Sequence, residues 1–435
     1  MSVAPHPARL AVIGAGWAGL SAAVRATEAG QTVAVFEMAP QVGGRARTVR
    51  RPDGAELDNG QHILIGAYTA TQRVMGLVGA ETAKLLRRLP LELRYPDGQG
   101  LKVAPGPALW GFARGVLGAR GWSLGERLAL LHTSLSWWRQ GMRNPGVDTV
   151  GALCAALPKR VREQLIEPLC VAAMNTPADQ ASATVFLRVL GDALFGTAGG
   201  SDLLLPRVGL SELFPRPAAA WLSAQGARIE LRRRIAELLP DGGGWRVDGE
   251  RFDALLLACS AIEAARLVRP LAPGWAEQAE ALRYEPIATV YLDRSPRPIP
   301  LPMLALHAGE GNPAQFVFDL DALGVCSGRL AFVVSGAGPW LAGGVEALTE
   351  AVRQQAEKQI PLHVAVGPSA RMRTMVERRA TFACVPDLRR PPIVVAPGLF
   401  ACGDYVQGPY PATLEGSVRS GLEAAERAIQ WLRTC

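Results

Sequence analysis

The sequence is short of the features that mark several classes of protein. Hydrophobic residues make up 49% of the 435 residues, and the mean hydropathy is +0.13. Even so, no uninterrupted apolar run reaches the roughly 18–20 residues that cross a bilayer as a helix. Internal repeats and low-complexity segments are also absent. A chain of this length exceeds what one hydrophobic core usually organises, so we expect two intertwined domains.

Cysteine and lysine are both scarce. The seven cysteines are scattered, and no two have CxxC spacing, which predicts neither a disulfide framework nor a zinc or other metal site and fits a reduced cytoplasmic compartment. Lysine occurs only at positions 84, 102, 159 and 358, so the net charge of +7 comes almost entirely from arginine. No basic run is interleaved with aromatic residues as in a nucleic-acid-binding module, and we expect no nucleic acid partner. Attraction to an anionic membrane surface accounts better for the charge.

Glycine, in contrast, is concentrated near the start of the chain. Residues 10–13 predict an apolar strand, and a Gly-x-Gly-x-x-Gly turn then opens a predicted helix. In a dinucleotide-binding fold the first glycine permits the tight turn, the second lets the backbone approach a pyrophosphate, and the third packs the helix on the sheet. The helix N-terminus offers free N–H groups to the phosphates. The predicted contacts in this turn are Gly14, Ala15, Gly16, Trp17, Ala18 and Gly19.

A second predicted strand, residues 32–36, leads to an acidic residue. Glu37 is placed to accept hydrogen bonds from a ribose, and Met38 follows it. Gly43, Gly44 and Arg45 come shortly after, where an NAD-binding fold has no need of two glycines and an arginine. These residues favour FAD as the cofactor. Residues 10–24 could be mistaken for a signal-peptide core, but the nucleotide-binding pattern explains them better, so we expect a protein that is not exported.

The C-terminal segment carries a second set of candidate contacts. A predicted buried strand over 393–401 delivers Gly403 and Asp404 to its carboxyl end, where open α/β sheets bind ligands. Thr413 and Leu414 then open a closing helix over 413–432. We expect Asp404 to bond the ribityl or pyrophosphate part of the flavin, and the N–H groups of the helix to meet the ring or the pyrophosphate.

The pattern between these two ends predicts the remaining architecture. Residues 46–57 predict a hairpin, residues 68–196 are mainly helical, and residues 284–293 and 315–336 predict strands of a second sheet. Other predicted elements are helices at 69–79, 147–157 (capped by Asp148), 210–226 and 345–359, strands at 228–239, 245–248 and 254–258, and a proline-rich loop at 296–302. We predict an α/β and α+β protein. Its Rossmann-like FAD-binding domain comprises 1–67, 205–283 and 391–435, and a substrate-binding domain of mixed sheet and helices comprises 68–204 and 284–390.

The motifs at the two ends resemble those of the amine oxidase and phytoene desaturase superfamily across essentially the whole chain. In such flavoproteins the loop of Gly44 and Arg45 crosses the pyrophosphate, and a residue after an arginine-rich strand touches the adenine through its backbone, which here implies Ile235. Residues 58–68 (DNGQHILIGAY), 167–176 (EPLCVAAMNT) and 210–214 (LSELF) look like the squalene-associated FAD-dependent desaturases, also called hydroxysqualene dehydroxylases.

This narrower resemblance implies reduction of hydroxysqualene to squalene by reduced FAD in squalene and hopanoid synthesis. Protonation of the allylic hydroxyl and loss of water would leave a delocalised cation, which a hydride from the flavin would quench. His62 is the candidate proton donor and a candidate flavin contact, and a packing role for it is equally open. Asp58 is expected to order the turn. For Glu167 and Asn175 two roles stay open: contact with the substrate hydroxyl, or helix capping and surface exposure.

Residues 107–143 combine aromatic residues with arginines. Two interpretations stay open: peripheral contact with the inner face of the cytoplasmic membrane, from which an insoluble substrate could be taken up, or a helical cap over the substrate cavity. The residues concerned are Trp110, Phe112, Trp122, Trp137 and Trp138 with Arg114, Arg120, Arg127, Arg139 and Arg143.

Three other functions compete with reductive dehydroxylation. A carotenoid-type desaturase would share the fold, the cofactor and the isoprenoid pocket. An amine oxidase commonly places a lysine on a substrate-domain strand, whereas residues 284–393 contain only Lys358, on a predicted helix. An isoprenoid-binding chaperone similar to the Rab GDP-dissociation inhibitors need not keep a complete flavin site, and this sequence has one. The oligomeric state and the electron donor do not follow from the sequence.

Overall fold

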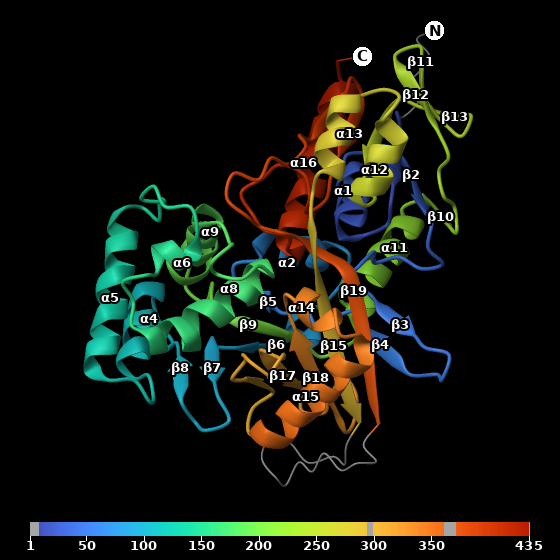
Figure 1. Ribbon diagram of the computed structural model, residues 1–435. Helices are drawn as coiled ribbons and strands as arrows, with labels where there is room; N and C mark the ends of the chain where they lie inside the picture. The colour runs from blue at the N-terminus through green and yellow to red at the C-terminus, as the bar shows by residue number, and fades with distance from the viewer. Residues whose placement is uncertain (1–7, 294–298, 361–370, 435) are drawn as a thin grey trace.

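The computed structural model describes residues 8–293, 299–360 and 371–434, and a six-stranded sheet forms the part predicted to bind the nucleotide (Figure 1). The strands are β1 (Arg9–Ile13), β2 (Thr32–Glu37), β10 (Arg228–Leu231), β14 (Ala254–Leu257), β20 (Val394–Ala396) and β21 (Leu399–Ala401). Their order is β10-β2-β1-β14-β21-β20, and all neighbours are parallel except β20 and β21. Three segments far apart in the sequence therefore build one sheet, as expected for this fold class.

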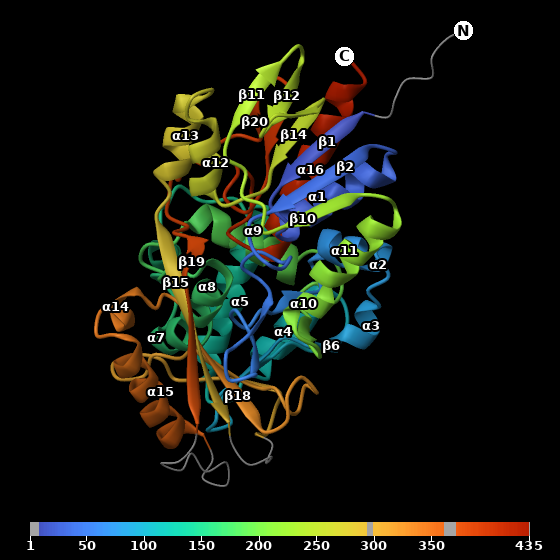
Figure 2. The same ribbon diagram turned by 90° about the vertical axis from the view of Figure 1, so that its right-hand side faces the viewer.

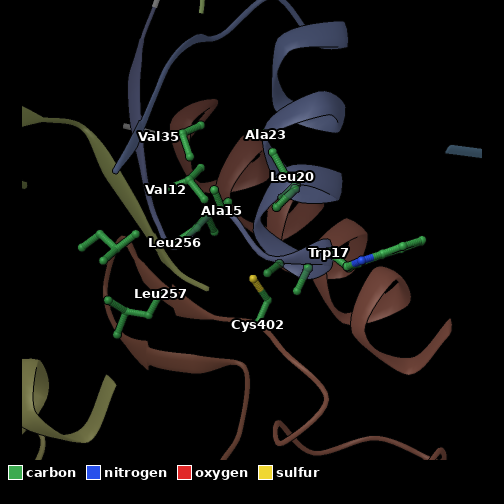
Figure 3. Close-up of a cluster of buried hydrophobic side chains, with 14 of the residues drawn as sticks. Val12, Ala15, Trp17, Leu20, Ala23, Val35, Leu256, Leu257 and Cys402 are labelled. Atoms are coloured by element: carbon green, nitrogen blue, oxygen red, sulfur yellow. The ribbon is translucent and has the colours of Figure 1, made fainter. Parts of the chain in front are cut away.

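Two helices cover one face of this sheet. They are α1 (Trp17–Glu28) and α16 (Leu414–Leu432), which contact each other. Figure 3 shows Val12 and Val35 of the sheet lying beside Leu20 and Ala23 of α1. All four side chains are buried, because the strands are apolar on both faces and α1 carries small residues toward them. Gly421 completes this packing, since a Cβ there would lie 2.2 Å from the carbonyl oxygen of Ala18.

A second, antiparallel sheet lies below the first (Figures 1 and 2). Its strands are β15 (Tyr284–Asp293), β16 (Met303–Ala305), β17 (Phe316–Asp319), β18 (Arg329–Val334) and β19 (Met372–Phe382), in the order β16-β17-β18-β15-β19. Helix α15 (Val345–Gln359) packs on one face through Leu348, Val352 and Ala356. The predicted second sheet is confirmed, whereas residues 296–298 of the predicted proline-rich loop lie outside the described residues.

A group of helices lies beside the second sheet and forms the left side of Figure 1. It comprises α4 (Ala108–Leu117), α5 (Leu124–Arg139), α6 (Val150–Leu153), α7 (Lys159–Val161), a π-helical turn (Arg162–Ile166), α8 (Glu167–Met174) and α9 (Ala183–Leu194). Among the described residues, no helix is both long enough and apolar enough to cross a membrane.

Shorter elements connect these parts. The helices are α2 (Thr69–Leu77), α3 (Thr82–Leu85), α10 (Leu210–Leu213), α11 (Pro215–Ala224), α12 (Ala261–Val268), α13 (Pro273–Glu280) and α14 (Gly338–Leu341). The small sheets are β3 (Thr48–Arg50) with β4 (Glu56–Asp58), β5 (Leu64–Ile65) with β9 (Leu203–Pro206) and β6 (Leu86–Leu89), β7 (Glu92–Arg94) with β8 (Gly100–Lys102), and β11 (Leu238–Asp241) with β12 (Gly244–Val247) and β13 (Glu250–Phe252). The predicted hairpin over 46–57 is confirmed by β3 and β4. The region 68–196 contains three strands, β6 to β8, that the helical prediction missed.

Three predicted elements are broken in the structure. The strand predicted over 228–239 ends at Leu231, because Arg232 has a left-handed backbone (φ 57°) and Arg233 donates its backbone N–H to the carbonyl of Glu37. The strand predicted over 393–401 is the β20–β21 hairpin, which turns at Gly398 (φ 71°). The helix predicted over 210–226 is interrupted at Phe214, where Pro215 starts α11.

Two predicted helix boundaries also move. The helix predicted over 147–157 is the four-residue α6. Its N-cap is Thr149 and not the predicted Asp148, and the Thr149 side chain accepts from the N–H of Ala152. The helix predicted over 69–79 ends at Leu77. The closing helix has Thr413 as its N-cap, and the Thr413 side chain accepts from the N–H of Gly416.

Candidate functional site

One cavity of about 440 Å³ runs from the glycine-rich turn to the second sheet. Its walls contain backbone and side chains from both ends of the chain and from the middle. The predicted contacts that line it are Gly14, Gly16, Trp17, Ala18, Glu37, Met38, Gly44, Arg45, His62, Ile235, Gly403, Asp404, Thr413 and Leu414. Two other predicted contacts, Ala15 and Gly19, are not among the residues that line it.

The glycine turn leaves no room for side chains. Gly14 has φ 112°, and a Cβ there would lie 2.6 Å from the carbonyl oxygen of Ala258 at the end of β14. A Cβ on Gly19 would lie 2.0 Å from the carbonyl oxygen of Gly14, so α1 starts directly against the turn. Gly44 has φ 59°, and its Cβ would lie 3.0 Å from the Cα of Gly16. Two backbone segments therefore face each other at this wall with no side chain between them, which suits a pyrophosphate.

Glu37 has two roles at the end of β2. Its carboxylate accepts from the N–H of Ala15 at 2.7 Å and from the N–H of Ala39 at 2.8 Å, and only 8% of the residue is exposed. It thereby fixes the glycine turn, and it also lines the cavity where a ribose hydroxyl is expected. Met38 beside it is 54% exposed.

Arg45 and Asp404 form an ion pair that sequence reasoning had assigned to separate contacts. A guanidinium nitrogen of Arg45 lies 2.5 Å from Asp404 Oδ1, and the other donates to the carbonyl of Ala380 on β19 at 2.8 Å. Burial by itself would lower the pKa of Arg45, but the charge and hydrogen bond of Asp404 outweigh it and raise that pKa. The pair joins the N-terminal loop, the C-terminal segment and the second sheet at one point.

Ile235 lies in the loop between β10 and β11 and not on a strand. Its carbonyl accepts from Arg266 at 2.6 Å, so the backbone group that it can offer to a ligand is its N–H. Arg233, Arg234, Glu263 and Arg266 line the cavity around it. Sequence reasoning missed Glu263 and Arg266, which lie on α12, because nothing in their local pattern indicates a ligand.

His62 lines the cavity next to Arg45 and is half-buried. Burial, assisted by the positive charge of Arg45, lowers the pKa of His62 to about 4. The imidazole is therefore neutral at neutral pH in the protein without ligands. Negative charge brought beside Arg45 would act in the opposite direction and raise this pKa.

Several polar atoms in the cavity wall have no hydrogen-bond partner among the described residues. They are the Tyr405 hydroxyl, Gln61 Oε1 and Arg47 Nε. Unpaired buried polar groups are rare in folded proteins. Three of the ten such side-chain atoms in the described part of the chain belong to residues of this one cavity, together with a glycine-lined backbone wall, an acidic strand end and a helix N-terminus. This set of hydrogen-bond donors and acceptors fits a flavin dinucleotide. Tyr405 directly follows the predicted Gly403 and Asp404, and sequence reasoning missed it.

The end of the cavity at the second sheet has a different lining. It is mostly apolar, and the polar side chains there are those of Asn175, Ser335, Glu377 and Thr381. The apolar residues are Ala172, Ala173, Ile287, Phe316, Phe318 and Val333. Asn175 is 2% exposed and lines the cavity, whereas Glu167 is an exposed residue at the start of α8.

Asp58 accepts from Thr48 Oγ1 at 2.6 Å and from the N–H of Leu210 at 3.0 Å, consistent with ordering the turn.

The aromatic residues of 107–143 divide into two groups. Phe112, Trp122 and Trp137 are buried in the helical region. Trp110 and Trp138 are 67% and 46% exposed.

Comparisons with known proteins point to a flavin cofactor. A family model described as flavin containing amine oxidoreductase matches residues 17–429. A hydroxysqualene dehydroxylase from Rhodopseudomonas palustris is 31% identical, over 96% of this chain and 97% of its own length. A 15-cis-phytoene desaturase from Synechococcus elongatus is 24% identical over 97% of this chain and 96% of its own length. The solved structure of cyclohexylamine oxidase from Brevibacterium oxydans superposes with a TM-score of 0.69 at 18% identity, covering 98% of this chain and 100% of that one.

Proposed function

Because this chain belongs to the flavin-containing amine oxidoreductase family and is an FAD-dependent oxidoreductase, we propose that it reduces hydroxysqualene to squalene. The relative that is 31% identical over nearly the whole chain carries that activity in its name. The reaction belongs to squalene and hopanoid synthesis, and the substrate is a long isoprenoid with one allylic hydroxyl.

The observation that carries this proposal is the continuity of the cavity. The nucleotide-binding wall and the apolar wall of the second sheet line the same space of about 440 Å³. An isoprenoid needs an apolar lining that excludes water, and a hydride acceptor must lie beside the flavin. Phe316 and Phe318 supply aromatic faces at the apolar end.

In the proposed reaction, the hydroxyl of the substrate takes up a proton and leaves as water, so the allylic carbon becomes a delocalised cation. Reduced FAD, when bound, supplies the hydride that forms the new C–H bond. The protein must exclude water, which would otherwise recapture the cation. Aromatic faces such as those of Phe316 and Phe318 stabilise positive charge near them.

His62 is the proposed proton donor. Its pKa of about 4 in the protein alone is too low for an imidazolium at neutral pH, and the charge of Arg45 contributes to that. An anionic ligand beside Arg45 opposes this effect, so the proposal requires that the pKa of His62 be higher in the loaded enzyme. His62→Ala with normal FAD content and full turnover would exclude the role.

A carotenoid-type desaturase is the second candidate, supported by the similarity to the phytoene desaturase. It would use the same cavity in the oxidative direction. The amine oxidase alternative is weaker, since Lys358 lies on the last turn of α15, is exposed, and is not among the residues that line the cavity.

Anaerobic single-turnover experiments separate these candidates. Photoreduced enzyme mixed with hydroxysqualene should return to the oxidised flavin spectrum, with one squalene formed per flavin. Oxidised enzyme mixed with phytoene should show no bleaching. Reduced flavin that persists in the presence of hydroxysqualene would contradict the proposal, and bleaching by phytoene would favour the desaturase. Protein that cannot be reconstituted with FAD would revive the chaperone alternative.

We also propose that α4 and α5 contact an anionic membrane surface peripherally. This is supported by five exposed large apolar side chains on these two helices, with exposed arginines nearby. Leu124, Leu128 and Trp138 lie on one side of α5, since their spacings of 4 and 10 residues are helical. The remaining members are Trp110 and Leu117. Protein that stays wholly unbound in flotation with anionic liposomes would contradict this contact, and Trp110→Ser with Trp138→Ser should weaken it.

A further inference from the structure

The cavity wall contains a polar pair whose location suggests how the substrate is held. Thr381 is 8% exposed and lies near the end of β19, where its Oγ1 accepts from Asn175 Nδ2 at 3.0 Å. Both residues line the cavity, and most side chains around them at this end are apolar. We infer that Thr381 binds the hydroxyl oxygen of the substrate and that Asn175 orients Thr381 for this contact; the inference rests on the proposed function.

Asn175 is held firmly at the end of α8. It has a left-handed backbone (φ 50°), its Oδ1 accepts from the N–H of Gly336 at 2.6 Å, and its Nδ2 also donates to the carbonyl of Glu285 at 3.2 Å. These bonds leave its amide group with one preferred orientation, with Nδ2 toward Thr381. A threonine hydroxyl that accepts from an amide must direct its own hydrogen elsewhere. Among the described residues no acceptor receives that hydrogen, so it is available to a ligand oxygen in the cavity.

The sheet is irregular at this point. The pairing of β15 with β19 passes from Glu285–Thr381 to Ile287–Glu377, so residues 378–380 of β19 are opposite Pro286 alone. Such bulges redirect side chains and are common next to active sites. The carbonyl of Ala380 that the bulge releases from the ladder accepts from Arg45.

This contact brings the polar pair next to the flavin-binding residues. Arg45 is paired with Asp404, and it contacts the residue directly before Thr381. A substrate hydroxyl on Thr381 would therefore lie near the cofactor end of the apolar wall, where hydride transfer must occur. A hydroxyl group in a mostly apolar lining discriminates strongly between ligands, because a ligand without the matching oxygen leaves the hydroxyl unpaired.

The test compares ligands with and without the hydroxyl. Oxidised wild-type enzyme should bind hydroxysqualene more tightly than squalene, measured by perturbation of the flavin spectrum. Thr381→Val keeps the shape and removes the hydroxyl, and it should weaken hydroxysqualene binding and single-turnover reduction by about 10- to 100-fold while squalene binding changes by less than about twofold. Thr381→Ser should recover most of the loss. Asn175→Ala should reduce the same preference for hydroxysqualene, because Thr381 loses its orienting partner.

Thr374→Val is a matched control on the same strand. Thr374 bonds Thr349 on α15 and is not among the residues that line the cavity, so this variant should keep the wild-type preference. FAD content verifies folding, and Thr381→Ala replaces Thr381→Val if the latter does not retain flavin. A Thr381→Val enzyme that still prefers hydroxysqualene by the wild-type factor overturns the inference while leaving the proposed function intact. Wild-type enzyme that hydroxysqualene does not reoxidise contradicts the proposed function itself.

Discussion

Replacing Tyr405 by phenylalanine should stabilise the apoprotein and at the same time weaken FAD binding. Its side chain is 2% exposed, it lines the cavity, and its hydroxyl has no partner among the described residues. Burial raises the pKa of Tyr405 well above its ordinary value, so the phenol stays protonated and can only donate or accept as a neutral group. Replacing it by phenylalanine removes one oxygen and leaves the packing against Trp275 in place.

The expected magnitudes follow from the cost of an unpaired polar group. A buried hydroxyl without a partner costs about 1–3 kcal/mol, so Tyr405→Phe should raise the free energy of unfolding of the apoprotein by about 1 kcal/mol. If the hydroxyl bonds FAD, the same variant loses a hydrogen bond in the holoprotein worth about 1.5–3 kcal/mol to a charged acceptor. The dissociation constant of FAD should then rise by about 10- to 100-fold.

Tyr291→Phe is the matched control. Tyr291 is 1% exposed, and its hydroxyl donates to the carbonyl of Asp58 at 2.8 Å. Its removal should lower the stability of the apoprotein by about 1 kcal/mol and leave FAD affinity nearly unchanged. Urea unfolding of both apoproteins and titration with FAD, followed by flavin fluorescence, measure the two quantities. An apoprotein that Tyr405→Phe destabilises as much as Tyr291→Phe would refute the reasoning, because the hydroxyl would then have a protein or water partner.

Three further predictions concern pH, the glycine cradle and helix packing. The pKa of His62 is about 4 in the folded apoprotein and about 6.5 in the unfolded chain, so the unfolded chain takes up a proton at a higher pH. The free energy of unfolding should therefore fall as the pH decreases from about 6.5 to 4, by at most about 3 kcal/mol. Urea titrations at several pH values measure this fall, and the His62→Asn variant should not show it. Gly44→Ala should weaken FAD binding at least tenfold by titration, whereas Gly54→Ala, with a similar φ but open space around it, should not. Glu415→Ala should lower the free energy of unfolding, and with it the melting temperature, because the buried carboxylate accepts from the N–H groups of Ala70 and Thr71 at the start of α2 and from the Thr71 hydroxyl. A loss of less than about 1 kcal/mol in the free energy of unfolding would contradict this role.

The parts of the structure that the sequence predicts are those decided locally. The strand, glycine turn and helix of residues 9–28 follow from hydrophobic periodicity and from the restricted space at Gly14 and Gly19. The same is true of α15, whose observed bounds are the predicted ones. Because parallel strands present their carboxyl ends at one edge, the predicted contacts at residues 14, 37 and 403 could be expected to meet there.

The parts that the sequence does not predict depend on partners far along the chain. Strand β10 ends where it does because the backbone N–H groups of Arg232 and Arg233 bond carbonyl groups at and just after the end of β2, which no local pattern around residue 232 indicates. The pairing of Arg45 with Asp404 joins residues that are 359 positions apart. Tyr405 was adjacent to a recognised motif, yet only the three-dimensional packing shows that its hydroxyl has no protein partner.

Arg45 links the two halves of the proposed chemistry. It pairs with Asp404 at the cofactor wall and, through Ala380, holds the bulge of β19 that presents Thr381 to the cavity. A change in the position of Arg45 would therefore alter both the flavin-binding wall and the proposed hydroxyl site, and its charge also lowers the pKa of His62. In the proposed reaction a single guanidinium would thus act on three functions: cofactor binding, substrate orientation and proton supply. Variants of Arg45 should consequently lose these functions together, whereas Thr381 and His62 variants with normal FAD content should separate them.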